Sequence, residues 1–293
     1  MGIRESATME KPSTLSKTLR GAALTLIVVF FMFPIAWILL MSFQTNETIL
    51  RIPPSVVFEP TLSNYQALIS GKLTSAAGTL DIAFMHNLWN SVLLSTLSVI
   101  LALILGVPAA YAFARYKFRL GEFIAFTLLS FRFAPPLLVL LPLSLIFQFL
   151  GLADTYIGLI WVYQLIALPL ILWIVRGYFE DISPDIEHAY RIAGHSWGST
   201  FFKIAVPLAG PGIAAAGLLA FIFCWNSFVF ALILASADKQ PVTVGALAFV
   251  TASGIQYGQI AAAIVLSVTP TLLLALYAQR YLVEGLSLGA VKG

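Results

Sequence analysis

Six long apolar stretches constrain this chain more than any other feature of its sequence. A helix of about 20 apolar residues is long enough to cross the hydrocarbon core of a bilayer. The six stretches span about 21–43, 91–114, 123–147, 156–175, 204–234 and 260–282. The sequence therefore predicts an all-α membrane protein with six transmembrane helices surrounded by membrane lipid.

The composition points to the same class of protein. Of the 293 residues, 60% are hydrophobic and only 10% are charged. Soluble domains carry roughly 25% charged residues, so too few charges remain here to cover a water-facing surface. The net charge of +3 is too small to indicate nucleic acid as a partner. The single cysteine, Cys224, lies in an apolar run, which excludes an intrachain disulfide and favours a core position.

The basic residues indicate how the chain is oriented, because Lys and Arg gather on the cytoplasmic side of membrane proteins. If the N-terminus is cytoplasmic, twelve basic residues lie inside and three lie outside, and Arg132 falls within a span. Both termini are therefore predicted to be cytoplasmic. The inner residues are Arg4, Lys11, Lys17, Arg20, Arg115, Lys117, Arg119, Arg176, Arg191, Lys203, Arg280 and Lys292, and the outer ones are Arg51, Lys72 and Lys239.

This topology divides the chain into three parts. A cytoplasmic N-terminal segment covers 1–20, a transmembrane domain covers 21–284, and a short cytoplasmic tail covers 285–293. The first apolar run is too long for a signal-peptide core and no small-residue cleavage site follows it, so it is predicted to be an uncleaved span. A polar loop at about 176–203 separates the fourth span from the fifth on the cytoplasmic side.

Every predicted span contains at least one proline. Proline removes a backbone donor and kinks a helix, and in a bilayer the freed carbonyls need partners in other helices or in a water-lined cavity. Prolines are common in membrane helices, but six spans out of six also fit a bundle that changes shape. The fifth stretch is too long for one straight span, and Pro207 and Pro211 near its start predict a bend or an interfacial entry.

The polar loop carries the signals of a short capped helix. Ser183 is a good N-cap, and Pro184 occupies the favoured first helical position. Asp185 and Glu187 place negative charge at the positive end of the helix dipole. Gly194 supplies the stop. These signals predict a helix of about ten residues, roughly 15 Å long.

One face of this predicted helix is apolar. Ile186, Ala189, Tyr190 and Ala193 follow the i, i+3, i+4, i+7 spacing. A helix this short is marginal alone, so the face needs a surface to pack on. That surface is either the chain's own spans and the lipid headgroups or a groove in a cytoplasmic partner.

The loop also resembles a known motif. Gly194 is followed at matching spacing by Ile204 and Pro207, and Glu187 and Ala189 lie upstream. This pattern resembles the EAA loop of ABC-importer permeases, which reads Glu-Ala-Ala, three residues, Gly, nine residues, then Ile-x-Leu-Pro. Other stretches resemble the maltose-type carbohydrate permeases, and together they cover nearly the whole chain. These stretches are 90–92, 109–115, 132–135, 225–226 and 285–293.

The match to the motif is imperfect. Its Glu-Ala-Ala positions hold His188, Ala189 and Tyr190, with Glu187 just before them, and its usual Asp before the glycine is Ala193. The departures affect the polar detail of docking rather than the docking helix. In the family this coupling helix contacts the ATPase subunit, and the C-terminal tail also reaches the ATPase dimer. The resemblance implies coupling roles for Ser183, Pro184, Ile186, Glu187, His188, Ala189, Tyr190, Arg191 and Gly194, and tail contacts for Gly289, Val291, Lys292 and Gly293.

The resemblance implies the ABC-importer type I permease fold and a role as the transmembrane permease subunit of an ATP-driven carbohydrate importer. The implied partners are a second permease, a cytoplasmic ATPase homodimer and an extracytoplasmic solute-binding protein, all at the bacterial cytoplasmic (inner) membrane. The chain has no Gly-x-x-x-x-Gly-Lys-Ser/Thr motif, so ATP and Mg²⁺ are expected on the ATPase subunits and not on this chain.

Four residues of the middle spans are candidates for the translocation path: Arg132, Pro135, Trp225 and Asn226. A charge within a span costs a few kcal/mol or more, which favours a pathway or helix-pairing role for Arg132 over snorkelling to an interface. Asn226 either bonds across helices or lines the path.

Two other functional classes would require residue patterns different from those of an importer. The three histidines are scattered over both sides of the membrane, so no metal site is predicted. An ion-coupled secondary carrier should show paired charges at mid-span, and a membrane-embedded enzyme should show a nucleophile–base or metal constellation. The sequence shows neither pattern.

Overall fold

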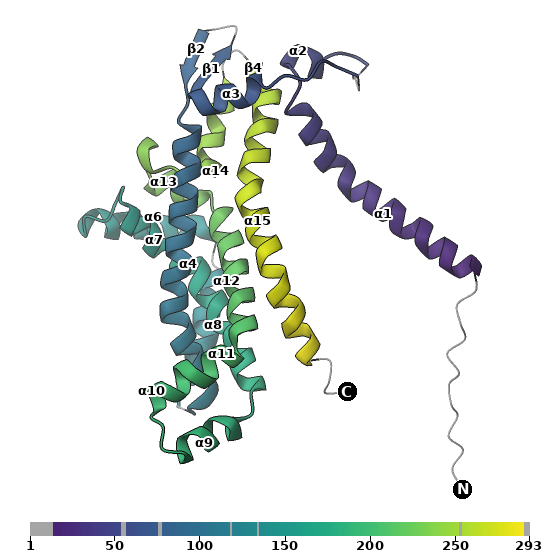
Figure 1. The fold of residues 1–293 in the computed structure, drawn as a ribbon. Helices are drawn as coiled ribbons and strands as arrows, with labels where there is room; N and C mark the ends of the chain where they lie inside the picture. Colours follow the sequence, from purple (N-terminus) through teal and green to yellow (C-terminus); the bar gives the residue numbers. More distant parts are fainter. Residues whose placement is uncertain are drawn as a thin grey trace.

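The computed structural model describes residues 14–289, apart from 54–56, 76–77, 118, 134 and 252–253. The chain is a helical bundle in which α4 (Phe84–Arg115) packs along α8 (Gln164–Asp181) and α12 (Gly210–Trp225). α15 (Tyr257–Gly289) lies along α12 on the other side (Figure 1). The expected all-α membrane class is confirmed.

Three single helices are long and apolar enough to cross a membrane, within α1 (Thr14–Met41), α4 and α15. The other three apolar stretches form bent pairs, which bring the number of possible spans to six if each pair counts as one. The spans predicted at 123–147, 156–175 and 204–234 are therefore not straight helices. Each is interrupted. The breaks of the third and fifth stretches lie beside prolines, whereas the break of the fourth lies at Tyr163, six residues before Pro169.

The largest bend, 101°, separates α5 (Gly121–Ser130) and the 3₁₀ turn η1 (Phe131–Phe133) from α6 (Pro136–Phe149). α7 (Tyr156–Val162) meets α8 at 43°. The π-helical turn η2 (Phe201–Ala205) and α11 (Val206–Leu208) meet α12 at 71° across Ala209, which confirms the bend predicted near Pro207 and Pro211. After α12, the chain continues into α13 (Val229–Leu234).

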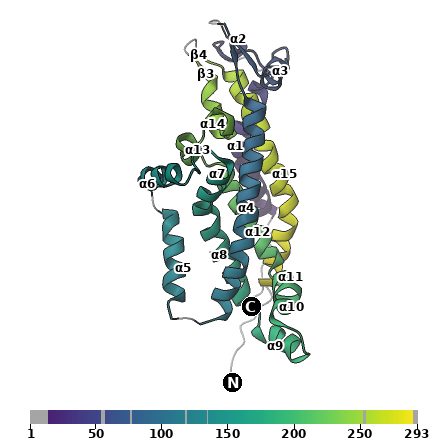
Figure 2. The same ribbon diagram turned by 90° about the vertical axis from the view of Figure 1, so that its left-hand side faces the viewer.

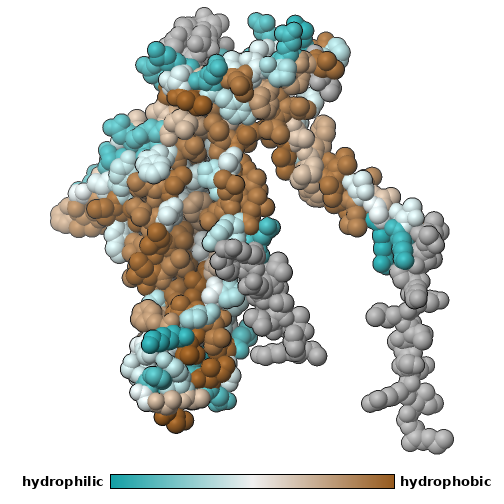
Figure 3. Space-filling view, viewed as in Figure 1, coloured by the Kyte–Doolittle hydropathy of each residue, from teal (hydrophilic) through white to brown (hydrophobic). Residues whose placement is uncertain are grey.

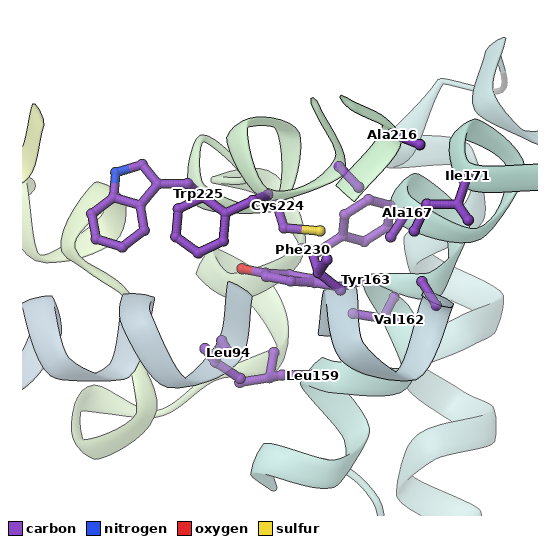
Figure 4. Packing of buried hydrophobic residues seen from close by; sticks show 14 of the residues in the cluster. Leu94, Leu159, Val162, Tyr163, Ala167, Ile171, Ala216, Cys224, Trp225 and Phe230 are labelled. Carbon is purple, nitrogen blue, oxygen red and sulfur yellow. The ribbon is translucent and has the colours of Figure 1, made fainter. Parts of the chain in front are cut away.

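The core lies where α4, α7, α8 and α12 meet (Figure 4). Small residues such as Ala167 and Ala216 let these helices approach, and larger side chains such as Leu94, Tyr163 and Ile171 fill the space between them. All five side chains are fully buried or nearly so. Cys224 is buried in the same cluster, as its apolar surroundings predicted.

The end of the bundle opposite the polar loop is capped by short elements. They are α2 (Asn46–Ile49), α3 (Ser63–Ser70), the hairpin of β1 (Lys72–Ser75) and β2 (Gly78–Asp81), η3 (Ala237–Lys239), α14 (Val242–Gly245), η4 (Ala246–Phe249), and the hairpin of β3 (Val250–Thr251) and β4 (Gly254–Ile255). Both hairpins are antiparallel, with Lys72 opposite Asp81 and Val250 opposite Ile255. We refer to this end as the outer cap.

Side-chain amides fasten the outer cap to the long helices. Asn64 of α3 donates to the carbonyls of Ser42 and Gln44, at 2.9 and 2.8 Å, just after α1 ends. Asn90 of α4 donates to the carbonyls of Asp238 and Gln240, at 2.9 and 3.1 Å. The cap is therefore one connected structure despite its short elements.

α1 leans away from the bundle and approaches it near its outer end (Figure 1). None of the apolar window of its candidate span is buried, and most of its large side chains are exposed. Figure 3 shows the apolar surface that α1 presents on one side of the molecule. A surface this apolar requires lipid or another protein around it.

Candidate functional site

The polar loop folds at the opposite end of the bundle from the outer cap (Figure 2). It contains α9 (Pro184–Ile192) and α10 (Trp197–Thr200). The Ser183 hydroxyl accepts a hydrogen bond from the Asp185 N–H at 3.3 Å, and Gly194 adopts a φ of 94° just past the helix. The positive φ is the conformation expected of a glycine that ends a helix. Both predicted ends of the loop helix are confirmed.

A buried carboxylate fixes α9 to the bundle. Glu187, the one residue of α9 that is buried, is 3% exposed. Its Oε1 lies 2.7 Å from Arg115 Nη2 and 2.8 Å from Arg115 Nε, and its Oε2 accepts from the Tyr111 hydroxyl at 2.6 Å. Arg115 Nη2 also donates to the Ile182 carbonyl at 3.0 Å, at the junction between α8 and α9. We call Tyr111, Arg115 and Glu187 the latch.

Aromatic rings support the latch. The Tyr111 ring packs edge-on against Phe179 of α8 with 5.2 Å between centroids, and against Phe201 of η2 at 5.0 Å. These contacts join α4, α8, α9 and the start of the fifth span around one hydroxyl and one ion pair. A carboxylate so surrounded is stable in a buried position because both of its oxygens accept hydrogen bonds and its charge is paired with Arg115.

The apolar face predicted for α9 points away from the bundle. Of the predicted face residues, Ile186 is 48% exposed, and Ala189 and Ala193 are also exposed. Ile192, next to this face, is 87% exposed. Among the predicted face residues, Tyr190 alone is half-buried, with its ring stacked on His195 at 3.9 Å between centroids. Packing of this face on the chain's own spans is therefore not observed among the described residues.

A cation–aromatic contact joins α9 to the part of the loop that follows it. The Arg191 guanidinium lies over the Trp197 ring of α10, 3.4 Å from its centroid. The Tyr190 hydroxyl lies 3.3 Å from the Ser199 hydroxyl. Through these contacts α9 and α10 form one surface.

Three of the four candidate path residues line two separate cavities. Arg132 lies on η1 beside a cavity of about 290 Å³ that Phe223 and Ser227 also line. Trp225 and Asn226 line a cavity of about 500 Å³ on the side of α15. The structure therefore places Arg132 apart from the Trp225–Asn226 pair.

The individual candidates differ in their surroundings. Trp225 is buried and stacks on Phe221, whereas Asn226 is exposed and donates to the carbonyl of Ile222, one turn back, at 2.8 Å. Pro135 is the exposed residue that precedes α6 and does not line either cavity.

Two further expectations concern the tail and metals. Gly289 is the last residue of α15, and Val291, Lys292 and Gly293 lie outside the described residues.

Across the part of the chain that the structure describes, no three histidine, cysteine or acidic side chains come together as a metal site would require.

A bundle of interrupted apolar helices, with a capped helix presented at one end, is the architecture of a membrane protein that crosses the bilayer several times. Comparison with known proteins identifies the family. The binding-protein-dependent transport system inner membrane component family matches residues 102–287, more than half of the chain. The chain belongs to this family.

Curated relatives extend the match over nearly the whole chain. A trehalose transport system permease of Mycobacterium tuberculosis is 35% identical over 276 residues, covering 92% of this chain and 95% of the relative. A trehalose/maltose transport system permease of Thermococcus litoralis is 32% identical and covers 92% and 94%. A maltose/maltodextrin transport system permease of Vibrio parahaemolyticus is 34% identical and covers 91% and 92%.

Solved structures share the fold. A chain of a bacterial ABC transporter involved in alginate import has a TM-score of 0.73 at 22% identity, over 93% of this chain and 98% of the other. A chain of the MetNI methionine ABC transporter has a TM-score of 0.57 at 16% identity, over 69% and 95%. The chain is thus a transmembrane permease subunit of an ABC importer and is not itself an enzyme.

Proposed function

We propose that this chain is one of two permease subunits of a carbohydrate importer in the bacterial cytoplasmic membrane, working by alternating access and driven by an ATPase dimer. The trehalose and maltose systems among its relatives support the carbohydrate class. The alternative of an ion-coupled carrier has no counterpart among these relatives.

The observation that carries the proposal is the way α9 is held. The latch fixes the helix rigidly to α4 through Glu187, while Ile186, Ala189 and Ile192 on other sides of the helix are exposed. A short helix with an uncovered apolar face fits a groove in a partner protein. We assign this partner as the ATPase subunit, which holds ATP and Mg²⁺, and we assign α9 as the coupling helix.

The remaining partners are assigned from the other exposed surfaces. The uncovered apolar surface of α1 suits a second permease subunit together with lipid. The outer cap, at the end far from α9, is the surface available to a solute-binding protein (Figure 1). One structural relative was solved with an alginate-bound periplasmic protein, at a TM-score of 0.61 and 14% identity.

In this proposal the chain crosses the membrane six times, each bent pair forming one span, with both ends in the cytoplasm. Arg132, Pro135, Trp225 and Asn226 remain candidates for the path. Arg132 and Pro135 lie at the break in the third span, and Trp225 and Asn226 lie at the end of α12. At both places helices end and backbone or polar groups become available to a solute. The tail at 285–293 is proposed to contact the ATPase dimer.

Co-purification and transport test the proposal. The tagged chain is expressed with the genes that adjoin it and reconstituted into proteoliposomes. We expect an ATPase and a second permease to co-purify. Uptake of labelled trehalose or maltose, the first sugars to try, should require both internal ATP and the binding protein. Uptake driven by an ion gradient without ATP would favour the carrier, and a purified chain without an ATPase partner would contradict the importer.

A further inference from the structure

α8 and α12 form a hairpin around the coupling loop. α8 ends at Asp181, immediately before the loop, and α12 begins at Gly210, shortly after it. The two helices pack against each other along their length. At 1.5 Å per residue, α8 reaches roughly 22 Å from the loop to its far end near Ile166. A movement of the loop therefore moves both arms of this hairpin.

Arg132 joins the two arms at the end far from the loop. Its Nη1 donates to the Ile166 carbonyl of α8 at 3.3 Å, and its guanidinium carbon lies 4.1 Å from the centroid of the Phe223 ring of α12. Ile166 lies two residues inside the start of α8, and Phe223 two residues before the end of α12. The residue comes from neither arm but from η1 in the third span.

The helix that carries Arg132 is itself fastened to α8. The Trp173 indole N–H donates to the Ala125 carbonyl of α5 at 3.2 Å. Arg176 of α8 forms an ion pair with Glu122 at the start of α5. These contacts hold α5 alongside α8 from the loop end upward, so that Arg132 stays in register with Ile166.

A positive charge at this depth requires a reason, because an arginine within a span is costly and usually functional. An arginine has five N–H donors, and one of them is used on the Ile166 carbonyl. The aromatic face of Phe223 stabilises the cation without neutralising it. Contacts of this kind can be made and released more readily than a buried ion pair, which suits a joint that must open.

We propose that Arg132 is a positioning residue that clamps the far ends of α8 and α12 together, and that release of this clamp opens the adjoining cavity when the coupling loop moves. The inference rests on the proposed importer function. It assigns to Arg132, among the candidate path residues, the control of a helix–helix joint.

The chain contains its own reporter of this joint. Cys224 is its one cysteine, follows Phe223 directly and is 1% exposed. Figure 4 shows its sulfur directed toward Tyr163, at the junction of α7 and α8, and toward Phe230 of α13. The sulfur therefore lies inside the packing between α12 and its neighbours. A small thiol reagent such as methyl methanethiosulfonate can reach this sulfur only when the packing opens.

The experiment uses the reconstituted importer, without nucleotide and after trapping with MgATP and vanadate. In the wild type we expect the rate of Cys224 modification to differ between the two states. Without nucleotide, the rate of Cys224 modification in Arg132→Gln should be roughly tenfold higher than in the wild type, because a hydrogen bond and a cation–π contact are lost together. In this variant the rate should depend little on nucleotide. Phe223→Leu should give a similar but smaller increase, and Arg132→Lys should restore part of the protection. Arg119→Gln, which removes an exposed charge, is the matched control.

Four outcomes are distinguishable. Slow, nucleotide-dependent modification in both Arg132→Gln and Phe223→Leu would overturn the clamp and leave the importer intact. If Arg132→Gln does not accumulate in the membrane, the test rests on Phe223→Leu: faster modification of Cys224 than in the wild type would support the clamp, and an unchanged rate would overturn it. An equal effect of Arg119→Gln would assign the change to net charge and overturn the clamp. Failure of the proposed function would appear separately, as a wild-type preparation with no ATPase and no ATP hydrolysis.

Discussion

Glu187 and Arg115 form a buried ion pair with 2.7 Å between Oε1 and Nη2, although 72 residues separate them in the sequence. The pair joins the end of α4 to the middle of α9. A rigid joint of this kind means that force applied to α9 is transmitted directly to α4 and, through the Ile182 carbonyl, to the end of α8. α9 is therefore part of the bundle and not a flexible attachment.

The first prediction concerns the stability of this joint. Removing one partner of a buried pair leaves the other charge uncompensated and costs about 3–5 kcal/mol. Glu187→Gln and Arg115→Gln should each lower the thermal stability of the detergent-purified permease. The double variant should lose less stability than the sum of the losses in the two single variants, because it leaves no unpaired charge buried.

Glu180→Gln is the matched control for this cycle. Glu180 pairs with Arg176 one turn away, and its side chain is 47% exposed. An exposed pair of this type contributes at most about 1 kcal/mol. If Glu187→Gln destabilised the permease no more than Glu180→Gln does, the latch would not be what holds α9.

The second prediction concerns the free face of α9. Ala189 is exposed, so Ala189→Asp should leave folding and membrane insertion unchanged. If the face docks in an ATPase groove, the substitution buries an unpaired charge at the interface, which is strongly unfavourable. We expect the ATPase to be lost on pull-down and uptake to fall with it. Ala189→Ser, similar in size and uncharged, should retain both. Full uptake by Ala189→Asp would show that this helix is not the coupling element.

The third prediction concerns acid sensitivity at the outer cap. Asp154, in the turn between α6 and α7, accepts from the Ser236 N–H at 2.8 Å and lies 3.4 Å from Lys239 Nζ. The hydrogen bonds with Ser236, and secondarily the charge of Lys239, hold the pKa of Asp154 below its ordinary value. The resulting stabilisation is present above the unfolded pKa of about 4 and is lost as the pH falls through the lower, folded pKa.

Asp154→Asn tests this pH dependence. Asp154 has a φ of 55°, a conformation that asparagine also tolerates, so the substitution removes the charge without straining the backbone. Between about pH 5 and pH 3 the melting temperature of the wild type should fall slightly more than that of the variant. The difference should be small because the carboxylate is 47% exposed. Parallel melting curves for the two proteins would contradict the assignment.

Local signals in the sequence were sufficient for the loop helix and for one of the bends. The N-cap at Ser183, the stop at Gly194 and the break before Pro211 depend on neighbouring residues and lie where they were predicted. The latch was missed because it depends on residues far apart in the chain. Its one sequence signal was a basic residue, Arg115, closing the second span on the same side as the loop.

The sharp bends of the third and fourth spans were also missed. Prolines indicated that kinks were present, but the size of each bend depends on which neighbouring helices receive the interrupted ends. The side of α9 that is buried, with Glu187, was missed for the same reason, because it depends on the helices that pack against α9. Its apolar pattern predicted a face that needs a partner, and the structure shows that the partner is not among the described residues of this chain.

The last prediction concerns topology, which the distribution of basic residues predicts and the fold makes testable. Lys72, on the outer cap, and Lys117, just after α4, lie at opposite ends of the bundle and both have exposed side chains. Lys72→Cys should react with an impermeant maleimide in intact spheroplasts, and Lys117→Cys should react only after permeabilisation. The unmodified chain is the control, because its single cysteine, Cys224, is buried and should not react. A reversed pattern would place α9 outside the cell, where no ATPase could reach it, and would overturn both the topology and the importer mechanism.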